Sequence, residues 1–283
     1  MYMRKPASFF IVGLLLCIFI ATVPASAHKT DNLNAESTVR SLTNSVASGE
    51  QPLEKINLVW QHDNLPSVDL STLPKVPGVN VVSPCWYVIG NEFGNLNVKA
   101  VEGYVARAHA KGYQVWPLIT NGFDPDRTKK LLQDDNAKHH VINQLLTEAE
   151  THGFDGINLD FENIYQEDKD ELTKFVKQIR KATKKRKLTL SIDVTMPEGS
   201  PNWSLCFDRK KLADQVDYVI LMAYDQYSGG SPMAGPTASY NWDKTGLQAT
   251  LLEVPASKLI MGIPLYMRLW HFDAKEKRFR AKT

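Results

Sequence analysis

Short apolar runs rich in β-branched and aromatic residues recur along the chain, and longer amphipathic stretches lie between them. Runs of this kind predict buried strands, whereas apolar residues spaced three and four apart predict helices. The predicted strands are residues 56–61, 79–89, 113–120, 156–162, 188–195, 218–225 and 259–266. The predicted helices include residues 98–112, 139–153 and 170–185, and Gly112 and Gly153 stand where left-handed helix caps are expected. This alternation predicts a parallel β/α architecture.

Polar or aromatic residues stand at the C-terminal tips of most predicted strands, among them Gln61, Asn121, Glu162, Asp193 and Asp225. Functional side chains spread over many strand ends are typical of a (β/α)8 TIM barrel, whereas a doubly wound nucleotide fold gathers them at one crevice. No glycine-rich phosphate loop follows any of the predicted strands. The fold class expected is therefore α/β, a (β/α)8 TIM barrel.

Seven strands are predicted for a barrel that needs eight. The 17 residues after Tyr266 are strongly basic and contain no further apolar run. We therefore expect a barrel truncated after its seventh strand. Either the chain is a truncated product, or the first and last strands are left as exposed pairing edges.

The first 27 residues are typical of a targeting segment rather than of a folded domain. Arg4 and Lys5 precede an apolar run over residues 9–20, and the small residues that end at Ala27 suit a signal peptidase. Residues 28–52 are polar, so we expect a flexible linker there and one domain over residues 53–283. The protein is expected to be secreted or associated with the cell wall, with an uncleaved membrane anchor as the alternative.

Composition narrows the picture only slightly. A hydrophobic fraction of 43% and an aromatic fraction of 10% fit a globular domain, and a net charge of +2 indicates no class of partner. The basic run at residues 184–187 ends a predicted helix, where cations are favoured, so no nucleic-acid binding is expected. Cys85 and Cys206 are far apart and have no metal-like spacing, so neither a metal site nor a required disulfide is predicted.

Polar side chains alternate with apolar ones in "GINLDFE", residues 156–162. In a strand, Asn158, Asp160 and Glu162 would share one face, and the apolar residues between them would share the other. Glycoside cleavage needs a general acid, and the charge of Asp160 would raise the pKa of Glu162 and keep it protonated. Solvated loop acids, helix caps or a calcium site within residues 155–160 are alternatives that leave the strict alternation unexplained.

The segment "DGINLDFE" resembles the signature of glycoside hydrolase family 18, the chitinase-like enzymes. The segments "SIDVT", "MAYD" and "GIPLYMR" resemble the fifth, sixth and seventh strands of that family, in the same order. The resemblance runs from about residue 55 to 270 and is closest to bacterial cell-wall and spore-cortex-type N-acetylglucosaminidases. It implies a TIM barrel and a substrate-assisted, retaining cleavage of β-1,4 bonds beside N-acetylglucosamine, in which the acetamido oxygen of the sugar attacks the anomeric carbon.

The resemblance also implies roles for individual residues. Glu162 would act as the acid and then as the base, Asp160 would orient the acetamido group, and Tyr224 would donate a hydrogen bond to the acetamido oxygen. Asn158 stands where many members have Asp, so less proton sharing with Asp160 is expected, and neither a cofactor nor a metal is implied. The expected substrate-binding residues are Asn158, Asp225, Trp86, Tyr87, Tyr266 and Arg268, with Trp116 and Trp203 as further aromatic platforms for sugar rings.

Two departures from the family pattern limit this interpretation. "PLITNG" stands where many chitinases have Ser-x-Gly-Gly, and an eighth-strand Trp is missing. The alternatives are therefore a non-catalytic glycan-binding protein or an inactive truncated fragment, while a metal-dependent deacetylase lacks His and Asp ligands at the strand tips. The expected partner is a polysaccharide containing N-acetylglucosamine, in peptidoglycan or a chitin-like glycan, and the protein is expected to be a monomer.

Overall fold

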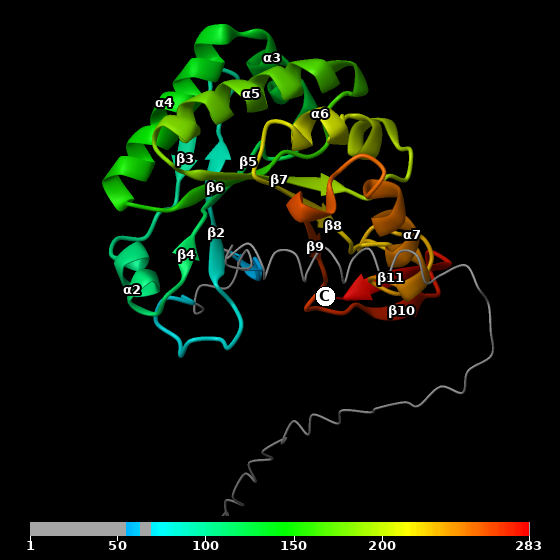
Figure 1. Ribbon diagram of the computed structural model, residues 1–283. Coiled ribbons are helices and arrows are strands. Elements are labelled where there is room, and N and C mark those ends of the chain that lie inside the picture. Colours follow the sequence, from blue (N-terminus) through cyan, green and yellow to red (C-terminus); the bar gives the residue numbers. More distant parts are fainter. Residues whose placement is uncertain (1–54, 63–68, 283) are drawn as a thin grey trace, which may run out of the picture. The chain divides into compact units, whose positions relative to one another are not determined.

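Seven parallel strands form one curved sheet, which is the strand layer of a TIM barrel (Figure 1). The computed structural model describes residues 55–62 and 69–282, so the expected signal segment 1–27 and linker 28–52 lie outside the described residues. The strands follow one another in chain order across the sheet: β1 (Leu58–Gln61), β2 (Val81–Ile89), β5 (Leu118–Thr120), β6 (Gly156–Asp160), β7 (Thr189–Thr195), β8 (Tyr218–Met222) and β9 (Leu259–Gly262).

All seven predicted strands are confirmed, although β6, β8 and β9 end earlier than the sequence pattern indicates. The run predicted at 113–120 is divided into β4 (Gln114–Val115) and β5, with Trp116 and Pro117 between them. The predicted helix 98–112 is shorter, because β3 (Leu96–Val98) pairs antiparallel with β2 and the helix begins only after Gly103, whose φ is 72°. The spacing of apolar residues within one segment does not predict that this segment pairs with another strand.

The helices are α2 (Tyr104–Ala110), α3 (Pro125–Gln133), α4 (Asp135–His152), α5 (Lys169–Lys185), α6 (Arg209–Ala213) and α7 (Tyr240–Thr250), with short helical turns at Gln166–Asp168, Pro201–Leu205 and Ala256–Lys258. At the start of α4, the Asp134 carboxylate accepts hydrogen bonds from two backbone N–H groups. Gly153 ends the same helix at φ 71°, which confirms the predicted left-handed cap.

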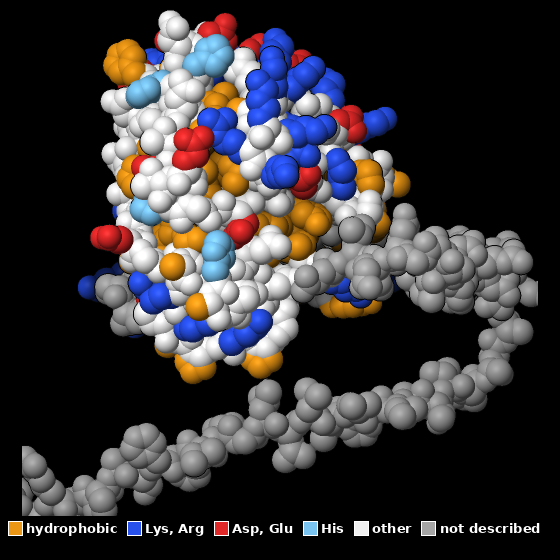
Figure 2. Space-filling view, turned by 60° about the vertical axis from the view of Figure 1, so that its left-hand side comes forward, with side chains coloured by type: hydrophobic (Ala, Val, Ile, Leu, Met, Phe, Trp, Pro, Cys, Tyr) orange, Lys and Arg blue, Asp and Glu red, His pale blue; other side chains and the backbone are white. Residues whose placement is uncertain are grey.

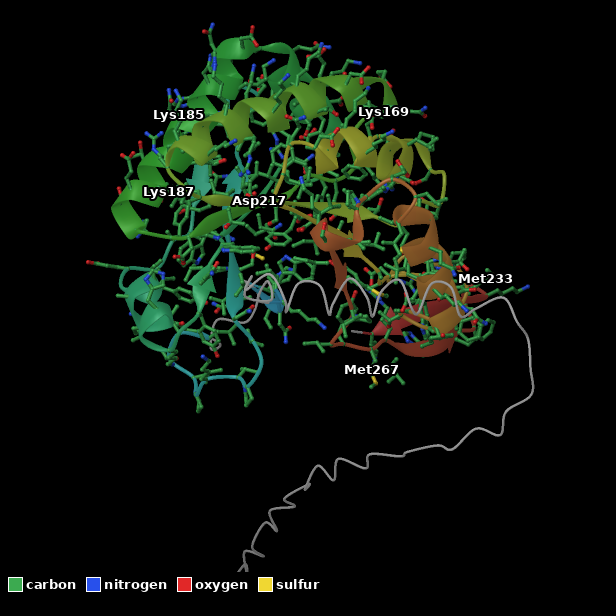
Figure 3. All side chains as sticks on the ribbon, in the orientation of Figure 1. Lys169, Lys185, Lys187, Asp217, Met233 and Met267 are labelled. Atoms are coloured by element: carbon green, nitrogen blue, oxygen red, sulfur yellow. The ribbon has the colours of Figure 1, made fainter. Side chains whose placement is uncertain are left out.

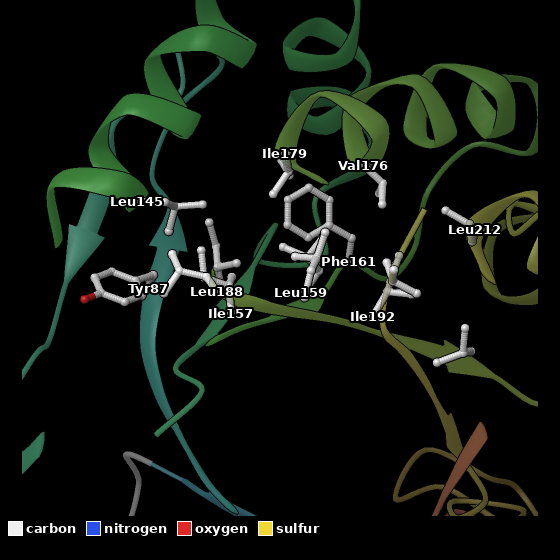
Figure 4. Packing of buried hydrophobic residues seen from close by; sticks show 14 of the residues in the cluster. Tyr87, Leu145, Ile157, Leu159, Phe161, Val176, Ile179, Leu188, Ile192 and Leu212 are labelled. Atoms are coloured by element: carbon white, nitrogen blue, oxygen red, sulfur yellow. The ribbon is translucent and has the colours of Figure 1, made fainter. Parts of the chain in front are cut away.

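The core lies between the sheet and the helices that cover its outer face. Leu159 and Phe161 point from β6 and its end toward α5, where the ring of Phe161 lies 6.1 Å from that of Phe175 (Figure 4). The opposite face of α5, whose ends are Lys169 and Lys185 in Figure 3, carries exposed lysines. Basic side chains gather on the face seen in Figure 2, as expected for a solvated helix surface.

The sheet has two ends, β1 and β9, and these two strands share no hydrogen-bonded ladder among the described residues. A side chain lies between them instead: a Cβ built on Gly262 would be 2.9 Å from the Cη2 atom of Trp60. The expectation that the first and last strands remain sheet edges is therefore confirmed.

The basic segment after Tyr266 adds no eighth strand to the barrel, as predicted, but it forms two strands of its own. β10 (Leu269–Asp273) and β11 (Arg278–Lys282) form a separate antiparallel hairpin, in which Phe272 pairs with Phe279. Apolar residues there recur at alternate positions rather than in a continuous run, and such a pattern suits a strand with one exposed face. The hairpin does not add to the barrel sheet.

Gly156, at the start of β6, has no room for a side chain. A Cβ there would lie 2.7 Å from the Trp116 ring and 2.8 Å from the backbone oxygen of Thr189. We expect Gly156→Ala to lower the free energy of unfolding by about 1–3 kcal/mol in urea titrations, because the neighbouring backbone must shift. Gly230→Ala is the matched control, since its nearest neighbouring atom is 4.0 Å away. Equal stability of the two variants would contradict the prediction.

Candidate active site

Side chains from four strand ends meet at the C-terminal edge of the sheet, where TIM-barrel sites lie. Asp160 is the last residue of β6, and Glu162 follows it by two positions. Their neighbours come from the segments that follow β5, β8 and β9, namely Asn121, Tyr224, Asp225, Tyr266 and Arg268. The sequence-predicted acids and the predicted residues Tyr224, Asp225, Tyr266 and Arg268 are therefore brought together.

Asp160 and Glu162 form a hydrogen-bonded pair of carboxyl groups that are largely removed from water. Burial raises the pKa of Asp160 to about 7. Burial, and then the adjacent Asp160 charge, raise the pKa of Glu162 to about 8. The pair therefore retains a proton near neutral pH, which is the state that a general acid requires. One buried oxygen of Asp160, Oδ1, has no hydrogen-bond partner in the protein.

Asn121 fixes the backbone on which Glu162 stands. Its Nδ2 donates to the Glu162 carbonyl oxygen at 2.8 Å, and its Oδ1 accepts from the Glu162 backbone N–H at 3.1 Å. The same Nδ2 donates to the Thr128 hydroxyl, so α3 supports the arrangement. Sequence reasoning placed Asn121 at a strand tip but gave it no role, because the contact crosses 41 residues of chain.

Asn158 lies below the carboxyl pair, fully buried, and all of its hydrogen bonds go to the protein. Its Oδ1 accepts from Trp60 Nε1 at 2.9 Å and from the Ser83 hydroxyl at 3.4 Å. Its Nδ2 donates to Asp193 Oδ1 at 2.7 Å and to the Ser191 hydroxyl at 3.1 Å. This position does not support the prediction that Asn158 contacts substrate. The side chain is not accessible from solvent, and its amide oxygen and amide hydrogens are already bonded to the protein.

Trp60 and Asp193 were not predicted as members of the site. The indole of Trp60 stands edge-on to the Tyr224 ring at 6.2 Å, in addition to its bond with Asn158. Asp193 is 1% exposed, and burial together with the nearby Asp160 charge raises its pKa well above the usual range. One signal for Asp193 was present in the sequence: "SIDVT" repeats the alternation of polar and apolar residues seen in β6.

Tyr224 and the rim residues close the other side of the site. Burial, and then the charges of Asp193, Asp160 and Glu162, raise the pKa of the Tyr224 phenol, which therefore remains a hydrogen-bond donor. Asp225 has a left-handed backbone, with φ 63°. Its carboxylate accepts hydrogen bonds from the Tyr266 hydroxyl and, at 2.6 Å, from Arg268 Nη1.

Four predicted sugar platforms differ in their placement. Trp86 and Tyr87 are 3% and 1% exposed. Trp86 packs against Tyr104 of α2 and His152 of α4, and Tyr87, which is labelled in Figure 4, donates to Glu148 of α4. Trp116 is buried against Tyr218. Their burial does not support the prediction that these three side chains stack on sugar. Trp203 is 42% exposed, so its ring surface remains accessible.

Comparison with known proteins places this arrangement in a family. The sequence profile described as "Glycosyl hydrolases family 18" matches residues 91–282, which is more than half of the chain. The chain belongs to glycosyl hydrolase family 18. The predicted family and the predicted enzyme class, a glycosidase, are thus confirmed at the level of the family.

The curated relatives in family 18 are longer proteins. The uncharacterized glycosylase YvbX of Bacillus subtilis (strain 168) is 32% identical over 179 residues, which are 60% of this chain and 51% of the relative. The cortical fragment-lytic enzyme of the same organism is 29% identical over 165 residues, which are 54% of this chain and 37% of the relative. The chain thus spans about half the length of the first relative, and less of the second.

Solved structures related to family 18 share the barrel. The C-terminal domain of a putative chitinase from Desulfitobacterium hafniense DCB-2 superposes with a TM-score of 0.70 at 25% identity, covering 81% of this chain and 72% of that one. The spore cortex-lytic enzyme SleL of Bacillus megaterium QM B1551 superposes with a TM-score of 0.67 at 19% identity, covering 79% of this chain and 54% of that one. The second likeness supports the fold alone.

Within residues 55–62 and 69–282, no group of three or more His, Cys, Asp or Glu side chains is arranged to hold a metal ion. In the same part of the chain, no helix combines the length and the apolar character needed to cross a membrane.

We expect Asn121→Ala to lower the free energy of unfolding by about 1–3 kcal/mol, because two buried backbone groups of Glu162 lose their partner. Urea titration measures this loss. Asn143→Ala is the control, because Asn143 is an exposed residue of helix α4. A loss no larger in Asn121→Ala than in Asn143→Ala would contradict the prediction.

The raised pKa values of Asp160 and Glu162 make stability depend on pH. Between about pH 4 and pH 8 the folded protein keeps protons that the unfolded chain releases, so the free energy of unfolding falls as pH rises. The slope is up to about 1.4 kcal/mol per pH unit for each proton. We expect Asp160→Asn to flatten it, measured by urea unfolding at pH 5, 6, 7 and 8. Parallel curves for wild type and variant would exclude the buried pair as the cause.

Proposed function

We propose that this protein is a secreted glycosidase that cleaves β-1,4 bonds beside N-acetylglucosamine by substrate-assisted, retaining catalysis. The observation that carries the proposal is the buried pair of Asp160 and Glu162, which holds a proton near neutral pH and leaves one Asp160 oxygen without a partner. A protonated carboxyl beside an unsatisfied carboxylate oxygen suits a substrate that accepts a proton at one atom and donates an amide hydrogen at another.

In the first step, protonated Glu162 gives its proton to the glycosidic oxygen as the bond to the anomeric carbon breaks. The acetamido oxygen of the same sugar forms the new bond to that carbon. The intermediate is therefore an oxazolinium ion, and no covalent bond to the enzyme forms. The Asp160 carboxylate accepts the acetamido N–H, and its negative charge balances the positive ring. The Tyr224 phenol donates to the acetamido oxygen and orients it for attack.

In the second step, the Glu162 carboxylate takes a proton from water, and the water oxygen attacks the anomeric carbon from the face that the leaving group vacated. The bond to the acetamido oxygen breaks, the acetamido group is restored, and the product retains the original configuration. Asn121 keeps Glu162 in one place for both proton transfers, because it bonds the backbone on either side of that residue.

Asp225, Tyr266 and Arg268 are proposed to contact the sugar at the rim. Their hydrogen bonds to one another order three polar side chains, and Asp225 and Tyr266 remain partly exposed.

Peptidoglycan is the proposed substrate rather than crystalline chitin. The name of the cortical fragment-lytic relative and the export signal expected at residues 1–27 support this choice, as does the "PLITNG" segment.

Mass spectrometry of the products from N-acetylglucosamine oligomers and from purified peptidoglycan tests the proposal. We expect wild type to release products and Glu162→Gln to be slower by about 10²–10⁴-fold, because the transferable proton is lost at nearly constant shape. Glu167→Gln is the matched control, since Glu167 is an exposed acid on the same segment that pairs with Lys129. Oligomers without the acetyl group should resist cleavage.

Circular dichroism confirms that each variant is folded before its rate is compared. Equal rates for wild type and Glu162→Gln would refute the assigned acid. A folded wild type that binds oligomers saturably but releases no product would instead support the non-catalytic glycan-binding protein.

A further inference from the structure

Asp193 has no part in the steps described above, although it is the most deeply buried acid near the site. It stands on β7 and is 1% exposed. Its Oδ1 accepts the shortest of the four hydrogen bonds made by Asn158, at 2.7 Å. An acid so thoroughly removed from water is costly unless its environment uses it.

The contacts of Asn158 leave one orientation for its amide group. Trp60 Nε1 can only donate, so the atom that faces it must be the amide oxygen. Asp193 Oδ1 faces the other end, which must be the amide nitrogen. Asp193 and Trp60 therefore hold the amide from opposite sides.

This orientation has a consequence for Asp160, the next residue on the same face of β6. Asn158 Nδ2 carries two hydrogens, and they are given to Asp193 and to Ser191. No amide hydrogen of Asn158 remains for Asp160, whose Oδ1 is buried without a partner. Asp160, which is half-buried, is then left with Glu162 as its hydrogen-bonded side-chain neighbour.

We propose that Asp193 is a positioning residue of the proposed reaction: it keeps the Asn158 amide turned away from Asp160, and it adds a third buried carboxyl group to the Asp160–Glu162 pair. Asp160 thereby stays free to receive the substrate amide. The proposal rests on the proposed glycosidase function. Asn158 has an amide and no carboxyl group, and in this proposal Asp193 on β7 supplies the carboxyl group instead.

The surroundings of Asp193 determine the direction of its electrostatic effect. The titratable groups that act on it are Asp160 and Glu162 from the β6 segment and the Tyr224 phenol after β8, while Asp225 acts on Glu162 from the rim. All of these groups are acids or neutral donors. Burial and the charges of Asp160 and Glu162 favour the neutral form of Asp193, because they raise its pKa well above the usual range. Replacing Asp193 by Asn therefore changes the hydrogen bond to Asn158 more than it changes the charge of the site.

The test is the pH dependence of kcat and KM for Asp193→Asn. We expect kcat to fall about 10- to 100-fold with little change in KM, the size expected when a hydrogen bond to a charged group is lost. We expect the alkaline limb of the kcat profile to stay in place, because Asp193 is favoured in its neutral form. Ser191→Ala is the matched control, because it removes a hydrogen bond to the same amide without changing charge, and the limb should stay in place.

Exchanging the two side chains separates a specific role from damage to the fold. Asn158→Asp alone places two carboxyl groups 2.7 Å apart and should lower activity. In the double variant Asn158→Asp/Asp193→Asn, residue 158 still accepts from Trp60, and residue 193 now donates to it. We expect the double variant to be more active than either single variant, with its alkaline limb close to that of wild type. No recovery, or a wild-type kcat in Asp193→Asn, would overturn the proposal.

A measurement without substrate distinguishes failure of this inference from failure of the proposed function. A raised pKa at Asp193 stabilises the folded state below about pH 4, and this contribution is lost as pH rises. Asp193→Asn should therefore show a flatter fall of unfolding free energy with pH than wild type does. If wild type cleaves nothing but the curves differ, only the glycosidase function fails. If wild type cleaves and the curves coincide, the Asp193 inference fails.

Discussion

The rest of this structure depends on one buried amide. The side chain of Asn158 joins four strands of the sheet, since it bonds Trp60 on β1, Ser83 on β2, and Ser191 and Asp193 on β7 from its own place on β6. A buried amide is tolerated only when its donors and acceptors are satisfied, so the interior of the barrel has little freedom to rearrange. The carboxyl pair at the strand end stands on this support.

The fold places acids where water would ordinarily be needed to stabilise them. Three buried carboxyl groups, Asp160, Glu162 and Asp193, cannot all be ionised, so the folded state retains protons that bulk solvent would take. The same burial that lowers stability at alkaline pH holds a proton ready for transfer. Stability and proton retention are thus two effects of a single desolvation cost.

Sequence patterns predicted the parts of the molecule that local periodicity determines. The seven strands, helix α5 and the grouping of Asp160, Glu162, Tyr224 and Asp225 were all readable from spacing or from the family resemblance. Contacts that depend on neighbouring strands were not, because the bonds of Asn158 to Trp60 and Asp193 need a register that no single segment encodes. Trp86 and Tyr87 were misplaced because a bulge in β2 changes which face their side chains occupy.

The β10–β11 hairpin gives the rim of the site an anchor of its own. Trp270 Nε1 donates to the Gly235 carbonyl, so the hairpin is tied to the loop that follows Asp225, and Tyr266 and Arg268 lie between β9 and the hairpin. None of these contacts passes through the strands of the barrel sheet. Local opening of the rim therefore need not unfold the sheet. Substitutions in the hairpin can therefore reshape the rim of the site without disturbing the carboxyl groups inside the sheet.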